Sequence, residues 1–326
     1  MEITCASARA HPNIAFVKYW GNRDDLLRIP RNGSISMNLA ELHTTTEVRF
    51  DPSLPADTLS IDDQSQSGAP LLRVSRFLDV IRRMASIKSF AAVTSANNFP
   101  TGAGIASSAS AFAALAYAGS KAAGLELDSI ALSRLARLGS GSACRSIPSG
   151  FVEWLPGIGE QDSYAVSIAP PSHWDLLDII AIVERGPKAT GSTEGHTLAK
   201  TSPLQEARVQ DTPRRLQLCK SAILQRDFST LAEIIELDSN LMHAVMMTSH
   251  PPLFYWQPIS LELMQAIPCW RAQGIAAAYT LDAGPNVHIV CLPESVNDII
   301  AKLNGLPGIQ QLFICHPGGP AHIITT

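Results

Sequence analysis

The sequence predicts a two-domain α+β protein, and three observations support this prediction. The chain has 326 residues, which is enough for two domains of ordinary size around separate cores. Strand-like apolar runs alternate with helical patterns, and the C-terminal part has the strand, strand, helix, strand order of a split βαβ unit. The polar, turn-rich stretch 186–203 interrupts this alternation, so we place the domains at residues 1–187 and 188–326.

Composition excludes several classes of function. The net charge is −4 and no face carries clustered Lys and Arg, so we expect no nucleic-acid partner. The sequence contains no run of 18 apolar residues, so we expect no membrane span, and the N-terminus does not resemble a signal peptide. The six cysteines lack CxxC spacing, which indicates reduced thiols in a cytoplasmic protein rather than disulfides or a zinc site.

Two strand patterns open the chain, at residues 3–10 and 14–20. Lys18 stands inside the second pattern, although lysine is rarely buried unless it is paired. One interpretation is an edge-strand lysine that reaches solvent. We favour a cation directed into a cleft, because the chain turns at once and Arg23 adds charge at the same rim.

The segment up to residue 124 predicts more strands and two helices. The arginines of the first helix fall away from its apolar positions, which is typical of a solvated face. The expected strands cover 34–39, 44–50, 57–61 and 91–95, the expected helices cover 71–85 and 109–123, and a polar hairpin loop covers 64–68.

Residues 98–111 lie between an expected strand and an expected helix and are rich in Gly and Ser. Gly102 and Gly104 permit a tight turn, and the free N–H groups at a helix N-terminus bind anions. Taken alone, this stretch fits equally a phosphate-binding loop and a small-residue loop that packs the helix on the sheet. It is no P-loop, because no lysine follows, and Ser107 stands where a dinucleotide fingerprint has glycine.

The next segment predicts a helix at 125–138 with Asp128 as its N-cap. The Gly/Ser-rich stretch 139–150 follows and contains Arg145. An arginine there offers a two-pronged donor for carboxylate or phosphate, although a lone arginine is more often structural. Expected strands follow at 151–155, 164–168 and 178–183.

In the C-terminal part, Ser192 either caps a short helix or faces the cleft. Asp282 lies between two expected strands in the sequence Asp-Ala-Gly-Pro, which is ordinary turn chemistry. The same position holds one carboxylate at the tip of two rigid strands, as a catalytic base requires. Helical patterns cover 203–250, 260–273 and 293–303, and strand patterns cover 276–281, 287–292 and 310–315.

Three stretches together resemble the mevalonate diphosphate decarboxylases of the GHMP kinase superfamily. They are Asn13-Ile-Ala-Phe-Val-Lys-Tyr-Trp-Gly-Asn-Arg-Asp24, Pro100-Thr-Gly-Ala-Gly-Ile-Ala-Ser-Ser-Ala-Ser110 and Leu281-Asp-Ala-Gly-Pro-Asn-Val287. The stretches 139–146 and 191–195 support the resemblance, which extends over essentially the whole chain. The second stretch resembles the phosphate loop of the superfamily, and the full set resembles its decarboxylase branch.

The resemblance implies a two-domain GHMP kinase fold. Its N-terminal domain is similar to ribosomal protein S5 domain 2, its C-terminal domain is ferredoxin-like, and the active site lies between them. It implies use of ATP and Mg²⁺ to phosphorylate the tertiary 3-hydroxyl of a 5-phosphorylated mevalonate. The 3-phosphate then leaves as the carboxylate departs as CO2, giving an isopentenyl product. Family members are often homodimers, so we expect a homodimer. We also expect a small phosphorylated molecule as the substrate that the protein binds.

The resemblance also assigns roles to matching residues. Asp282 would take or orient the hydroxyl proton, Lys18 would stabilise the transferred phosphate, and Arg145 would grip the substrate carboxylate. Magnesium would be held mainly by phosphate oxygens and water, with Ser107 and Ser108 nearby. Substrate-binding positions are Asn13, Tyr19, Asn22, Arg23, Ser142 and Ser192. ATP-binding positions are Ser95, Asn98, Gly102, Gly104, Ala106, Ser107 and Ser108.

Asn22 departs from the pattern of the family, which has lysine there, in the pocket for the 5-phosphate end. Loss of this cation weakens binding of the more highly charged group most, so mevalonate 5-monophosphate is an alternative substrate, and Arg23 is a candidate for compensation. A kinase that does not release CO2 and a nucleotide-binding protein without catalysis are further alternatives. The joint presence of Lys18, Arg145 and Asp282 argues against both.

Overall fold

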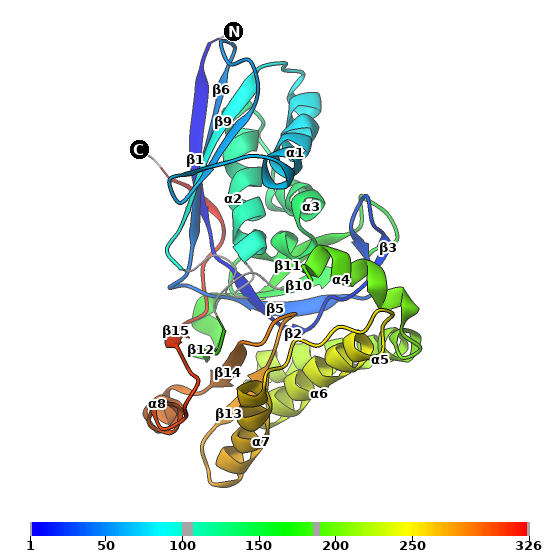
Figure 1. Cartoon of the computed structure of the whole chain (residues 1–326), viewed down its shortest axis with the longest axis vertical. Helices are drawn as coiled ribbons and strands as arrows, with labels where there is room; N and C mark the ends of the chain where they lie inside the picture. Colours follow the sequence, from blue (N-terminus) through cyan, green and yellow to red (C-terminus); the bar gives the residue numbers. More distant parts are fainter. Residues whose placement is uncertain (1, 100–106, 185–189, 325–326) are drawn as a thin grey trace.

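The mixed α+β architecture expected from the sequence is present in the computed structural model, which describes residues 2–99, 107–184 and 190–324 (Figure 1). Within these residues, the strands form a six-stranded sheet, two four-stranded sheets and a two-stranded hairpin. None of the helices in the described segments combines the length and the hydropathy needed to cross a bilayer.

The six-stranded sheet has the strand order β16-β1-β6-β9-β7-β8. Buried and less buried side chains alternate along β6 and β9, because one face of the sheet packs against helices. Helix α2 lies along β1 and β6, with α1 and α3 beside it (Figure 1). The elements are β1 Thr4–Ala10, β6 Thr44–Asp51, β7 Thr58–Ile61, β8 Gln64–Gln66, β9 Phe90–Asn97, β16 His322–Ile324, α1 Ala69–Ala85, α2 Ser107–Ala122 and α3 Ser129–Gly139.

The first four-stranded sheet has the order β11-β10-β5-β2 and lies in the middle of the molecule (Figure 1). Every residue of β2 and β5 is buried, because α5 and α6 pack against these strands and the short helix η1 contacts them as well. Lys18 follows β2 directly and therefore emerges inside the protein. The elements are β2 Asn13–Val17, β5 Ser34–Asn38, η1 Gly141–Ser146, β10 Phe151–Leu155, β11 Tyr164–Ala169, α5 Gln205–Gln225 and α6 Phe228–Met247.

The second four-stranded sheet has the order β13-β14-β12-β15, and all neighbouring strands are antiparallel. This is the strand order of a ferredoxin-like split βαβ unit, so the expectation for the C-terminal part is confirmed. Apolar residues of α7 and α8 pack on this sheet and form its core. The elements are β12 Leu177–Ile182, β13 Ala277–Thr280, β14 Val287–Cys291, β15 Gln311–Cys315, α4 Ser192–Leu198, α7 Pro258–Ala272 and α8 Val296–Asn304.

Local signals predicted several boundaries correctly and one loop wrongly. The predicted N-cap Asp128 accepts a backbone N–H from the first turn of α3 at 2.7 Å, and Asp227 caps α6 in the same way at 3.1 Å. The expected hairpin loop at 64–68 is wrong, because β8 begins at residue 64. The turn is formed by Asp62 and Asp63, whose φ angles of 48° and 61° are the left-handed values that a tight hairpin requires.

Sheet membership crosses the boundary that the sequence suggested between the domains. Strand β12 precedes residue 187, yet it pairs with β14 and β15. Strand β16 comes near the end of the chain, yet it pairs with β1. The division at residues 187 and 188 stays a prediction, and each sheet combines strands from distant parts of the chain.

Candidate active site

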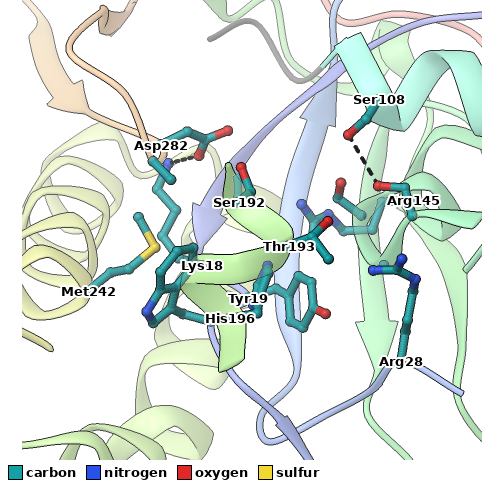
Figure 2. A pocket seen from close by; sticks show the side chains of 16 residues that line it. Lys18, Tyr19, Arg28, Ser108, Arg145, Ser192, Thr193, His196, Met242 and Asp282 are labelled. Carbon is teal, nitrogen blue, oxygen red and sulfur yellow. Dashed lines mark hydrogen bonds and ion pairs between the residues drawn. The ribbon is translucent and has the colours of Figure 1, made fainter. Parts of the chain in front are cut away.

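A polar cavity of about 100 Å³ lies where β2, η1, α4 and the loop between β13 and β14 meet (Figure 2). It brings together side chains from both halves of the chain, so folding alone places them near one another. The predicted residues that line it are Lys18, Tyr19, Ser108, Ser142, Arg145, Ser192 and Asp282.

Lys18 and Asp282 form an ion pair on one side of this cavity (Figure 2). The Lys18 Nζ donates to Asp282 Oδ1 at 2.7 Å, and the side chains are 1% and 27% exposed. Burial lowers the pKa of Lys18, and Asp282 only partly opposes this effect. Burial acts to raise the pKa of Asp282, but Lys18, His288 and Arg145 together hold it below its ordinary value. Asp282 is therefore a carboxylate near neutral pH, and the Lys18 Nζ is its ion-pair partner.

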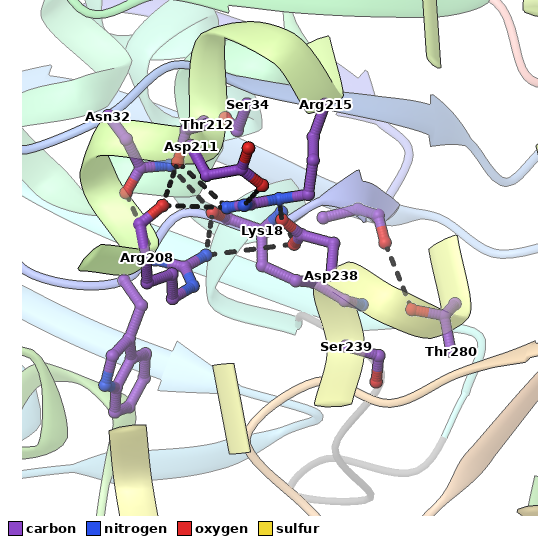
Figure 3. A network of polar contacts seen from close by, with 12 residues as sticks. Lys18, Asn32, Ser34, Arg208, Asp211, Thr212, Arg215, Asp238, Ser239 and Thr280 are labelled. Atoms are coloured by element: carbon purple, nitrogen blue, oxygen red, sulfur yellow. Dashed lines mark hydrogen bonds and ion pairs between the residues drawn. The ribbon is translucent and has the colours of Figure 1, made fainter. Parts of the chain in front are cut away.

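The backbone of Lys18 is fixed from two sides by the C-terminal helices (Figure 3). Its N–H donates to Asp238 Oδ2 at 2.6 Å, and its carbonyl accepts from Asn32 Nδ2 at 2.9 Å and Arg208 Nη2 at 2.7 Å. Arg215 Nε in turn donates to Asp238 Oδ1 at 2.8 Å. This fully buried network holds the lysine in place for the cavity.

Arg145 faces the same cavity from η1 and is 3% exposed. Its Nε and Nη2 donate to Asn13 Oδ1 at 3.1 and 3.0 Å, and its Nη1 donates to Ser34 Oγ at 2.7 Å. A guanidinium has five N–H donors, so donors remain for an anion in the cavity. Asn13 does not line the cavity; it orients Arg145 and donates to Ser146 Oγ at 2.8 Å.

Tyr19 borders the cavity because Gly141 leaves room for its ring. A Cβ on Gly141 would lie 2.6 Å from Cε1 of Tyr19. The ring also stacks on His196 at a centroid distance of 4.0 Å, and its hydroxyl donates to Asn22 Oδ1. Burial raises the pKa of Tyr19, so its hydroxyl stays a neutral donor.

A second cavity of about 200 Å³ adjoins the first and has mainly apolar walls, including Leu59, Val93 and Phe112. The predicted residues Ser95, Ser107 and Ser108 line it. Ser108 lines both cavities, and its Oγ lies 3.2 Å from the Oγ of Ser140, which lines the first. One serine at the start of α2 thus stands between a polar and an apolar cavity.

Some predicted residues lie elsewhere. Asn98 lines neither cavity; its amide accepts from the N–H of His43 and donates to the carbonyl of Glu41, each at 2.7 Å. Arg23 is exposed and directed to the carbonyl of Gly157 at 3.5 Å. Asn22 accepts the Tyr19 hydroxyl but does not line the cavity. Gly102, Gly104 and Ala106 lie outside the described residues.

The sequence interpretation missed several lining residues. Thr193 and His196 share the helix α4 with Ser192, and the four-position spacing from Ser192 was the available signal for His196. His196 Nδ1 accepts from the N–H of Gly21 at 3.0 Å, and burial lowers its pKa to about 3, so the ring is neutral. No sequence signal indicated Arg28. The remaining missed residues are Ala15, Trp20, Ser140, Gly141, Met242 and Ala283.

The sheet topology and the two adjoining cavities define a protein of the GHMP kinase fold with a site built from both halves of the chain. Residues 10–165 match the family model of the diphosphomevalonate decarboxylase-like N-terminal domain. Residues 178–312 match that of the mevalonate 5-diphosphate decarboxylase C-terminal domain. The chain belongs to the diphosphomevalonate decarboxylase family.

Individual relatives agree with this assignment. The diphosphomevalonate decarboxylases of Ganoderma lucidum and Homo sapiens are both 38% identical to the chain. They cover 92% and 94% of it, and the chain covers 81% and 80% of them. Among solved structures, the mevalonate diphosphate decarboxylase of Staphylococcus aureus is similar, with a TM-score of 0.94, 37% identity and 99% coverage of both chains. A structure described as MDDEF in complex with MVAPP, AMPPCP and magnesium has a TM-score of 0.95, 36% identity and 100% coverage of both chains.

Proposed function

We propose that the chain is an ATP-dependent decarboxylase that converts mevalonate 5-diphosphate to isopentenyl diphosphate, with release of ADP, phosphate and CO2. The observation that carries the proposal is the position of Ser108 between the two cavities. The apolar cavity suits a nucleotide base and ribose, and the polar cavity suits a small anionic alcohol. A phosphoryl group passing from one to the other crosses at this serine.

The residues of the apolar cavity fit a nucleotide. Arg73 lines it, its buried Nε has no hydrogen-bond partner among the described residues, and its guanidinium lies 4.5 Å from the centre of the Phe112 ring. Arg73 Nη2 donates to the carbonyl of Gly139 at 2.8 Å, and further guanidinium donors remain for a nucleotide oxygen. The described residues contain no cluster of three or more His, Cys, Asp or Glu side chains that could hold a metal. Magnesium would accordingly be bound through nucleotide phosphates, with Ser107 and Ser108 hydroxyls beside it.

The first half of the reaction needs a better nucleophile than a tertiary alcohol. When bound, MgATP supplies the phosphoryl group that makes the 3-oxygen a leaving group. Asp282 is held as a carboxylate and accepts or orients the hydroxyl proton. Lys18 fixes this carboxylate at 2.7 Å, and its ammonium neutralises charge that builds up on the transferred phosphate.

The second half breaks a carbon–carbon bond. The substrate carboxylate must be held so that, as it leaves as CO2, the electron pair of its C–C bond forms the new C=C bond and the 3-phosphate departs with the C–O pair. Arg145 offers its remaining donors to that carboxylate, and Asn13 and Ser34 prevent it from turning away. Ser142 and Ser192 line the same cavity as neutral partners for substrate oxygens.

Mevalonate 5-monophosphate is the second candidate substrate, because the position of the expected lysine holds a neutral side chain. The Asn22 carboxamide accepts from the Tyr19 hydroxyl and donates to Asp25 Oδ1 at 2.9 Å. A carboxylate beside this position disfavours additional negative charge. A cytoplasmic homodimer also stays a prediction, tested by light scattering of the purified protein and by cell fractionation.

One assay tests the proposed function against its alternatives. The protein is incubated with ATP and Mg²⁺ and with each mevalonate phosphate in turn, and ADP and CO2 are measured. We expect equal amounts of both products. ADP without CO2 would identify a kinase, and neither product with either substrate would refute the enzymatic function altogether.

A further inference from the structure

A short hairpin, β3 Asn22–Asp24 and β4 Ile29–Pro30, projects one arginine into the polar cavity. Arg28 has a φ of 51°, a left-handed conformation that a non-glycine residue adopts only when its surroundings require it. Its Nε donates to the carbonyl of Leu138 at 3.1 Å, in the last turn of α3. The hairpin and this bond together direct the guanidinium toward the cavity.

Arg28 has no carboxylate partner among the described residues. None of the ion pairs among the described residues includes Arg28. Its positive charge nevertheless acts on two neighbours: it opposes the rise in the pKa of Tyr19, and it helps to lower the pKa of Arg73. Arg28 and Arg73 share no carboxylate among the residues that the structure describes, and two such neighbouring cations attract an anionic ligand. Of the two cations on the hairpin, Arg28 lines the cavity and Arg23 points away from it.

The position of Arg28 complements the reacting end of the cavity. Figure 2 shows Asp282 and Lys18 on one side and Arg28 on the other, with Tyr19 and His196 between them. In a 5-phosphorylated mevalonate, two carbons and an ester oxygen separate the carbon bearing the 3-hydroxyl from the phosphorus. A substrate whose hydroxyl meets Asp282 therefore extends its phosphate toward the opposite side.

His196 provides a neutral donor on the way. Because its Nδ1 accepts the Gly21 N–H, the proton of the neutral ring is on Nε2. The side of the cavity opposite Asp282 thus offers the Arg28 guanidinium and the imidazole N–H of His196, while the Tyr19 hydroxyl donates to Asn22. This combination suits a phosphate that already forms an ester.

We propose that Arg28 binds the 5-phosphate end of the substrate and selects the phosphorylated alcohol over the unphosphorylated one. The inference rests on the proposed function, since it assigns one end of that substrate to one residue. It also accounts for asparagine at position 22, because a cation is supplied instead from the turn of the same hairpin, directly before β4.

The test compares Arg28→Gln with Arg76→Gln in the full-length protein. Arg76 carries the same charge on α1, is exposed and does not line the polar cavity, so its variant is the matched control. We expect Arg28→Gln to raise KM for mevalonate 5-diphosphate about 10- to 100-fold, the effect of losing one charge-assisted hydrogen bond. KM for ATP should change less than about twofold, and Arg76→Gln should resemble the unaltered protein.

Two further variants separate binding from folding. Arg28→Gly accepts the left-handed backbone without strain but loses the bond to Leu138. A purely structural role predicts a lower melting temperature with unchanged KM, whereas the proposal predicts the same rise in KM as in Arg28→Gln. Asn22→Lys in the Arg28→Gln protein returns a cation to the same rim and should recover at least a tenth of the lost kcat/KM. For unphosphorylated mevalonate, the turnover of Arg28→Gln should not be lower than that of the unaltered protein.

The outcomes also distinguish this inference from the proposed function. If the unaltered protein turns over the phosphorylated substrate and Arg28→Gln leaves its KM unchanged, the inference is wrong and the function stands. A rise in KM for ATP alone would assign Arg28 to the nucleotide and overturn the inference as well. If the unaltered protein releases no CO2 from either phosphate, the proposed function fails, and the inference that rests on it fails too.

Discussion

The substitution Asp282→Asn tests both the chemistry and the electrostatics of the Lys18–Asp282 pair. The amide keeps the shape of the side chain but can neither accept the hydroxyl proton nor neutralise Lys18. General base catalysis contributes about 10²–10⁴-fold, so kcat should fall by at least that factor while the affinity for ATP stays nearly unchanged. The measurements are ADP and CO2 release at saturating substrates and calorimetric titration with a nonhydrolysable nucleotide.

The same substitution has an energetic cost that can be estimated from the structure. Removing one partner of a buried ion pair costs about 3–5 kcal/mol. Because the Asp282 side chain is 27% exposed and Lys18 is 1% exposed, we expect the lower end, about 3 kcal/mol at neutral pH. The urea midpoint reports this loss. Asp79→Asn, which breaks the more exposed pair with Arg82 on α1, is the matched control and should cost less than about 1 kcal/mol.

The pH dependence of this loss has a defined sign. The pKa of Lys18 is lower in the folded chain than in the unfolded chain, so the unfolded chain binds more protons as the pH approaches 10.5. The free energy of unfolding contributed by Lys18 therefore rises with pH over that window. Without the Asp282 carboxylate the pKa of Lys18 falls further and the window begins nearer neutrality. Part of the lost stability of Asp282→Asn should therefore return between pH 7 and pH 10. Equal slopes of unfolding free energy against pH for the variant and the unaltered protein would refute the electrostatic argument. Normal turnover of the variant would refute the catalytic role.

Three other substitutions test separate parts of the site. Gly141→Ala places a methyl group about 2.6 Å from the Tyr19 ring, so it should cost about 1–3 kcal/mol of stability and raise KM for the substrate. The control Gly319→Ala has open space around it and should change neither quantity. Equal melting temperatures for the two variants would contradict the packing argument. Ser108→Ala removes the hydroxyl shared by both cavities and should lower kcat about 10-fold in an ADP-release assay, so full activity would exclude it from phosphoryl transfer. Asp238→Asn leaves buried arginine uncompensated and should lower the free energy of unfolding by about 3–5 kcal/mol in urea, and an unchanged midpoint would show that the network is not stabilising.

The fold was predictable where the signal is local. Strands such as β12 and β14 are mainly apolar runs, each with one polar residue, Asp178 or His288. The side chain of Asp128 marks the start of α3 because it caps the helix. The β3–β4 hairpin and β16 were not predicted, because strands of two or three residues have too few positions to show a period. These short strands form only because they pair with other strands, and no local sequence pattern encodes that pairing.

The candidate site divides in the same way. Lys18, Arg145 and Asp282 stand out in the sequence because each interrupts an apolar or small-residue stretch, and the structure brings them to one cavity. Asn98 lies beside the Gly/Ser loop in sequence, but its amide is used to hold residues 41–43. Arg28 could not be found, because its place in the cavity depends on the hairpin turning back toward α3.

The position of β12 in its sheet has a consequence for biosynthesis. All six residues of this strand are buried, and its partners on the two sides are β14 and β15, which begin at residues 287 and 311. Roughly a hundred further residues must be translated before either partner exists, which takes about 5–20 s at about 5–20 residues per second. During that time an apolar strand has both edges open, which is the condition that favours association with other chains. Expression yield should therefore depend on chaperones that shield nascent chains, even if the folded protein is stable.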